Sequence, residues 1–150
     1  MVLVVVFVVL AAGAAGGAWW LRRRTGDAPE QGASWVVPTQ IDRADFTRAD
    51  SPWLVLVFSS ATCLSCQGTW EKARHLESDV VATQEVEAVR DKALHTRYEV
   101  EAVPMVVIAD ETGAVRASFV GEPSATDLWA SLAELREPGS TPEACDHGTG

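Results

Sequence analysis

The chain carries a C-x-x-C motif, formed by Cys63 and Cys66. The motif follows an apolar segment, residues 53–58, that is typical of a buried strand, and it begins a segment with helical periodicity. Unpaired N–H groups in the first turn of a helix stabilise a thiolate. A three-residue step also puts both sulfur atoms on one helix face, close enough to form a disulfide. The motif therefore predicts a redox-active pair.

A zinc site is the chemical alternative for the same cysteines. Cys145 and His147 would complete a set of four ligands. Their spacing is tighter than in usual zinc patterns, and they lie far away in a polar segment rich in Gly and Pro. We therefore expect no metal and no bound cofactor. The chain has three cysteines, an odd number, so we interpret Cys145 as a stray thiol rather than part of a disulfide scaffold.

The N-terminus has a different character from the rest. Residues 2–21 contain no charge and are followed at once by Arg22, Arg23 and Arg24. About 20 apolar residues match the thickness of a bilayer core, so the segment predicts one transmembrane helix. A cleaved signal peptide is the alternative, but it would place basic residues before a shorter apolar core. A buried core helix is disfavoured because the segment is not amphipathic.

The three arginines also predict the orientation of the protein. Basic residues that flank a membrane helix tend to stay in the cytoplasm. Since all of them follow the apolar segment, we expect a single-pass membrane protein whose soluble domain is cytoplasmic. An extracytoplasmic domain is the alternative, because many membrane-tethered thiol domains face that way.

The soluble part of the chain is strongly acidic. After the three arginines, the chain has the other 9 of its 12 basic residues and all 21 of its acidic residues. Nucleic-acid binding needs a basic face, so the charge argues against it. We expect contact with the membrane only through the N-terminal helix and its arginines.

The predicted elements alternate between strands and helices. We interpret residues 22–38 as a linker and residues 137–150 as a disordered tail. Between them, Thr39 or Asp42 can cap a short helix that ends at Phe46. The apolar pattern then predicts strands at 53–59, 81–89, 105–109 and 115–120, and helices at 63–79, 91–98 and 125–136. Asp91 and Ser124 are the expected caps of the last two helices. The order β-α-β-α-β-β-α indicates an α/β fold with a mixed sheet and helices on both faces.

This order resembles the thioredoxin family over residues 39–136. The cysteine pair lies at the first strand–helix junction, and Val103-Pro104 precedes the hairpin, 38 residues after Cys66. The apolar N-terminal segment with its trailing arginines looks like the small membrane-tethered thioredoxin-like proteins of actinobacteria.

The resemblance implies a protein thiol–disulfide oxidoreductase. Cys63 would be the attacking thiol and Cys66 the resolving thiol. Pro104 would have a cis peptide bond and, with Val103, would bind the extended backbone of a substrate. The expected partners are protein dithiols or disulfides, together with an electron donor or acceptor that the sequence does not identify.

The sequence departs from the family pattern at the motif. Thr62 replaces the usual Trp, Leu64-Ser65 replaces Gly-Pro, and Val57 replaces a buried acid on the central strand. Without that acid, proton transfer to and from Cys66 must use water or another group. The alternative function is therefore a binding or scaffold module with little or no turnover. We expect His75 and His95 to lie in helices, away from the cysteines.

Overall fold

The computed structural model describes residues 35–139 of the chain. The predicted membrane helix at residues 2–21, most of the linker and nearly all of the tail lie outside this range. Within residues 35–139, no helix has the length and apolar character needed to span a bilayer.

The described elements follow the predicted order. They are the 3-10 helix η1 (Arg43–Asp45), β1 (Trp53–Ser59), α2 (Leu64–Ala73) with its 3-10 extension η2 (Arg74–Leu76), β2 (Val81–Glu87), α3 (Lys92–Arg97), β3 (Met105–Asp110), β4 (Val115–Val120) and α4 (Ala125–Arg136). Apolar segments that alternate with amphipathic ones thus produce the β-α-β-α-β-β-α order expected from the sequence.

The four strands form one mixed sheet in the order β2-β1-β3-β4. The strands β1 and β2, joined through α2, are parallel, whereas β1 pairs with β3 and β3 with β4 in antiparallel fashion. The two central strands, β1 and β3, are buried almost throughout, which explains their uninterrupted apolar sequences.

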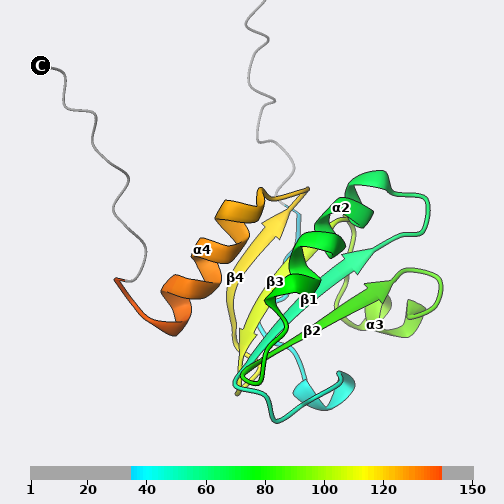
Figure 1. Ribbon diagram of the computed structural model, residues 1–150. Helices are drawn as coiled ribbons and strands as arrows, with labels where there is room; N and C mark the ends of the chain where they lie inside the picture. Colours follow the sequence, from blue (N-terminus) through cyan, green and yellow to red (C-terminus); the bar gives the residue numbers. More distant parts are fainter. Residues whose placement is uncertain (1–34, 140–150) are drawn as a thin grey trace, which may run out of the picture. The chain divides into compact units, whose positions relative to one another are not determined.

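Helices cover both faces of the sheet, as predicted. On one face, Val55 and Val57 of β1 pack with Ala73 of α2 and Leu128 of α4. The helices α2 and α4 lie over the near face in Figure 1. On the other face, Phe58 belongs to a cluster with residues from the η1 and α3 regions. This arrangement makes β1 the centre of two cores and holds its C-terminal end rigidly.

Two elements end two or more residues earlier than predicted, because side chains bind the backbone there. The helix α2 and its extension η2 do not reach Asp79, because the Arg48 guanidinium donates to the carbonyl oxygens of Ser78 and Asp79. The second strand ends at Glu87 because its own carboxylate accepts the N–H groups of the next residues and turns the chain. Neither kind of contact leaves a periodic signal in the sequence.

The predicted caps are correct in position but differ in their bonds. Asp42 and Ser124 accept backbone N–H groups of η1 and α4, at 3.0 Å in each case. Asp91 precedes α3, but its carboxylate accepts the N–H of Glu87 at 2.9 Å instead of capping the helix. Asp91 therefore fixes the end of β2 to the start of α3.

Candidate functional site

The cysteine pair forms a disulfide across the first turn of α2. Cys63 occupies the N-cap position, and Cys66 lies inside the helix with a Cα–Cα distance of 5.2 Å. The sulfur of Cys63 accepts the N–H of Cys66 at 3.1 Å, and the Ser65 hydroxyl lies 3.4 Å from the same sulfur. A sulfur at this position receives the hydrogen-bond donors that the helix start leaves unpaired.

The two sulfur-bearing residues differ in exposure. Cys63 is half-buried and is flanked by exposed residues, of which Leu64 is 82% accessible. Cys66 is only 1% accessible, since it lies on the helix face that packs on the sheet. A large partner can therefore approach the first sulfur but not the second.

Hydrogen bonds attach the loop before Cys63 to the end of β2. The Glu87 carboxylate accepts the N–H of Ala61 at 3.1 Å, and the carbonyl of Ser59 accepts the N–H of Ala88 at 2.9 Å. The N–H of Arg90, followed by those of Ala61 and Val89, lowers the pKa of Glu87, so this carboxylate stays ionised. These bonds hold the cysteine-bearing turn in place.

Val103 and Pro104 lie at the same end of the sheet as the cysteines. The first residue of β3, Met105, pairs with Phe58, the penultimate residue of β1. The peptide bond between Val103 and Pro104 is cis. Among residues 35–139, none donates to or accepts from the backbone of Val103, so its N–H and C=O are free. The fold thus brings the four predicted site residues to one edge.

His95 lies in a helix, as predicted, and packs against Phe58 on the face of the sheet opposite α2. Its ring meets the Phe58 ring edge-on at 5.3 Å, and its Nε2 lies 2.9 Å from the carbonyl oxygen of Val86. The register between β1 and β2 brings α3 close to the end of the central strand, which the spacing along the chain does not reveal. His95 packs against the core there, whereas His75 is exposed in η2.

The sequence also gave no sign of a polar contact beside Val57. Ser59 is 1% accessible, and its hydroxyl donates to Oε1 of Glu85 at 2.8 Å. These residues are 26 positions apart in the chain, and parallel pairing of β1 with β2 brings them together. A buried hydroxyl and a half-buried carboxylate therefore lie near the site where the sequence shows only Val57.

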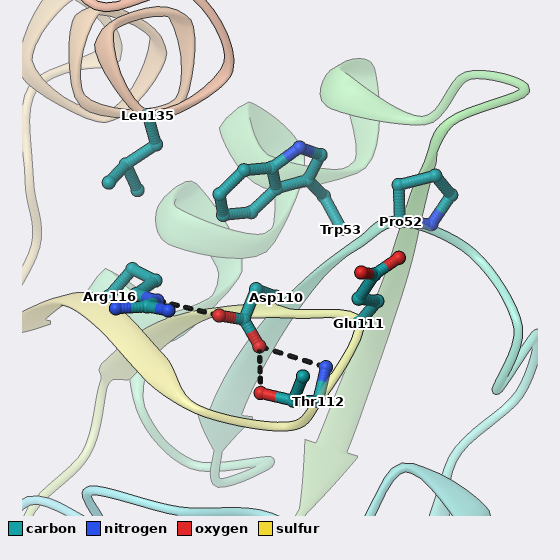
Figure 2. Close-up of a pocket in the computed structure, with 7 residues that line it drawn as sticks. All are labelled: Pro52, Trp53, Asp110, Glu111, Thr112, Arg116 and Leu135. Atoms are coloured by element: carbon teal, nitrogen blue, oxygen red, sulfur yellow. Dashed lines mark hydrogen bonds and ion pairs between the residues drawn. The ribbon is translucent and has the colours of Figure 1, made fainter.

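A cavity of about 520 Å³ lies at the opposite end of the sheet. Its walls include Trp53, the first residue of β1, and Asp110, the last residue of β3. Figure 2 shows that Arg116 and Thr112 point at the Asp110 carboxylate rather than into open space. The charges of Asp110 and Arg116 thus pair with each other, and the cavity lies at the end of the sheet opposite the cysteines. Within residues 35–139, no cluster of His, Cys, Asp and Glu could hold a metal ion.

Asp110→Asn should destabilise the domain at neutral pH by about 1–3 kcal/mol, because the carboxylate accepts hydrogen bonds from several groups. The Thr112 hydroxyl, then Arg116 and backbone N–H groups, lower the pKa of Asp110 to about 2. Since the pKa is lower in the folded state, this stabilisation is complete above the ordinary value near 4 and is lost as the pH falls through about 2.

Urea denaturation as a function of pH measures this effect. Glu111→Gln, a change of an exposed neighbouring acid, is the control and should alter the free energy of unfolding by no more than about 0.5 kcal/mol. If Asp110→Asn and Glu111→Gln have the same small effect at neutral pH, the assigned role of Asp110 is wrong.

The described domain has the fold of solved thioredoxins. It is similar to the germline-specific thioredoxin Deadhead from Drosophila melanogaster, with 24% identity, a TM-score of 0.51, and coverage of 58% of this chain and 84% of that one. It is also similar to a mutant thioredoxin from Halobacterium salinarum, with 24% identity, a TM-score of 0.50, and coverage of 58% and 76%. No protein-family model and no curated protein matches the sequence. The likeness establishes a thioredoxin-like fold.

Proposed function

We propose that this chain is a membrane-tethered thiol–disulfide oxidoreductase that exchanges disulfides with protein substrates through Cys63 and Cys66. The observation that carries the proposal is the disulfide at the start of α2, which joins an approachable cysteine to a buried one. This asymmetry suits a two-step exchange in which one sulfur meets the substrate and the other closes the ring.

In the reducing direction, the Cys63 thiolate attacks one sulfur of a substrate disulfide. The substrate S–S bond breaks, the leaving thiolate takes up a proton, and a mixed disulfide joins Cys63 to the substrate. Cys66 then loses its proton and attacks Cys63 Sγ, which releases the second substrate thiolate. The substrate gains two electrons and the pair becomes the observed disulfide; oxidation of a substrate dithiol is the reverse.

The position of Cys63 supports its role as the nucleophile. The thiolate is the reactive form of cysteine, and donors at a helix N-terminus favour it over the thiol. The N–H of Cys66 already points at this sulfur, at 3.1 Å, in the oxidised protein. Once the disulfide is reduced, the same donor can stabilise the negative charge.

The backbone of Val103 supports a protein substrate. Its N–H and C=O, which no group within residues 35–139 engages, can bond to an extended chain, as in strand addition to a sheet edge. Leu64, the first residue of α2, and Val89, in the loop after β2, are 82% and 81% accessible and offer apolar contacts at this end of the sheet. Val103 and Pro104 would therefore position substrate backbone next to Cys63.

The membrane tether is the second part of the proposal. It is supported by the uncharged segment 2–21 and the arginines that follow it. A cytoplasmic domain would be kept reduced and would act as a reductant, whereas an external domain would need its own electron supply.

Fusions at Gly150 test the orientation. A fluorescent protein that matures only in the cytoplasm should be active, and alkaline phosphatase, which is active only outside, should be inactive. Replacing Arg22, Arg23 and Arg24 with Gln and adding lysines after Met1 should invert this result. Phosphatase activity in the unchanged protein would exclude the cytoplasmic assignment.

A binding module with little turnover is the competing function, and Val57 in place of a buried acid favours it. Insulin reduction separates the two, with the full-length chain in mild detergent and dithiothreitol as the electron source. We expect the wild type to accelerate insulin precipitation about 10-fold or more over dithiothreitol alone, and Cys63→Ser to give no acceleration. No acceleration by the wild type, together with no oxidation of a reduced protein, would favour the binding module.

A further inference from the structure

The resolving step requires that the buried Cys66 thiol lose its proton. Before Cys66 can attack the mixed disulfide, its thiol must give up a proton, and a buried thiol has little contact with water. Cys66 is 1% accessible, and the strand position where the family carries an acid holds Val57, which is fully buried among apolar residues. The proton therefore needs another acceptor.

Ser59 and Glu85 lie where such an acceptor is needed. Val57 and Ser59 are two residues apart on β1 and so face the same side of the sheet, the side covered by α2. Glu85 is the β2 partner of Val57 in the parallel register, and its carboxylate accepts the Ser59 hydroxyl at 2.8 Å. A carboxylate on the neighbouring strand thus reaches the end of the central strand through a buried hydroxyl.

Helix geometry places Cys66 over the C-terminal end of β1. Ala73, on the buried face of α2, packs with Val55 and Val57, and α2 runs back along the sheet. Cys66 lies two turns earlier on that face, about 10 Å further along the helix axis at 1.5 Å per residue. That distance equals about three strand residues, which brings Cys66 level with Ser59.

Within the part of the chain that the structure describes, few other charges lie near the Glu85 carboxylate. The buried face of α2 carries Cys66, Thr69 and Ala73 and adds no charge, and the buried residues of α4 are leucines. On the β2 side, Arg90 interacts with Glu85 and donates to its backbone carbonyl at 2.9 Å, and the nearby Glu87 carboxylate is occupied by N–H groups of the loops. The Glu122 carboxylate lies against Gly68 of α2, but it is paired with Lys72. Of the acids in residues 35–139, Glu85 is therefore the one available to Cys66.

We propose that Glu85, acting through Ser59, accepts the proton of Cys66 in the resolving step. The Cys66 proton moves to the Ser59 hydroxyl, directly or through one bridging water molecule, while the hydroxyl proton moves to the Glu85 carboxylate. The Cys66 thiolate then displaces the substrate sulfur from Cys63. Glu85 is half-buried, so it returns the proton to solvent. Ser59 takes part in the proton transfer and Glu85 acts through it, and this role rests on the proposed oxidoreductase function.

Thionitrobenzoate release isolates the resolving step without any protein substrate. In a Cys145→Ser background, the reduced full-length chain in mild detergent reacts with Ellman's reagent in two stages. Cys63 forms a mixed disulfide and releases one thionitrobenzoate, and Cys66 then displaces the second. Glu85→Gln and Ser59→Ala should each slow the second release about 10-fold or more at neutral pH and change the first by less than about 2-fold.

The pH profile distinguishes a proton acceptor from a structural effect. In Glu85→Gln, the rate of the second thionitrobenzoate release should fall about tenfold for each lower pH unit, because only ionised Cys66 then reacts. The same rate in the wild type should fall less steeply. The double variant should be no slower than Glu85→Gln alone, since the two residues act as one unit. Glu71→Gln, at an exposed position of α2, should match the wild type.

The outcomes separate this proposal from the proposed function. A wild-type chain that releases only one thionitrobenzoate would overturn both. A wild type with rapid second release, and folded Glu85→Gln and Ser59→Ala variants with the same rate and pH profile, would overturn the relay alone and leave the oxidoreductase function intact. Circular dichroism confirms that each variant is folded.

Discussion

A Cys66→Ser variant is expected to accumulate mixed disulfides with its protein substrates through Cys63, whereas Cys63→Ser should accumulate none. Without the resolving thiol, the first exchange stops at the covalent intermediate. The difference in exposure dictates the order, because Cys63 is approachable and Cys66 is 1% accessible. Non-reducing gel electrophoresis of cell extracts, followed by mass spectrometry of the trapped species, measures this.

The same variants have a large expected effect on turnover. Insulin reduction by Cys63→Ser should fall about 10-fold or more, to the rate with dithiothreitol alone, since the nucleophile is gone. The double variant should resemble Cys63→Ser. Equal trapping by the two single variants would contradict the roles assigned to the cysteines.

The second large effect is expected from Val57→Asp, which introduces a carboxyl into the core. Val57 is fully buried with Val55 and Leu128, and Glu85 is its partner on β2. Burial of a charge without a partner, next to another carboxylate, should cost about 3 kcal/mol or more of the free energy of unfolding at neutral pH. Urea denaturation of the full-length chain in mild detergent gives this value.

The cost should depend on pH with a predictable sign. Burial raises the pKa of the introduced carboxyl, so the folded state favours the neutral acid. The destabilisation is therefore largest above the raised pKa and declines as the pH falls toward the ordinary value near 4. Val120→Asp is the matched control, because Val120 is 41% accessible on β4, and it should cost no more than about 0.5 kcal/mol. Similar costs at the two positions would refute the assignment of Val57 to the core.

The strand positions were predictable because their signals are local. A buried strand needs uninterrupted apolar sequence, so β1 has the predicted bounds, 53–59. In β4, half-buried and exposed residues alternate, and this period-2 pattern also has the predicted bounds, 115–120. The end of α2 was not predictable, because the contacts of Arg48 with the backbone near Asp79 depend on the folded arrangement. Sequence periodicity reports which face is buried but not where a distant side chain interrupts an element.

The sequence likewise predicts one part of the candidate site and not the other. The cysteine pair is visible as a motif because its two residues are neighbours in a helix. The Ser59–Glu85 pair has no such signature, since it depends on the parallel register of two strands that α2 separates in the chain. A serine at the end of an apolar strand and a glutamate within another are common, and only the register gives them a shared position.

The central claim is that Cys63 and Cys66 exchange electrons with a protein disulfide, and stoichiometric exchange tests it most directly. The reduced full-length chain, in the Cys145→Ser background, is mixed with an equal amount of insulin, quenched with acid and analysed by mass spectrometry. The account predicts that the Cys63–Cys66 disulfide forms in step with the loss of insulin disulfides, one for one. A folded chain whose cysteines stay reduced with insulin, and stay oxidised when the disulfide form meets a reduced protein, would contradict it.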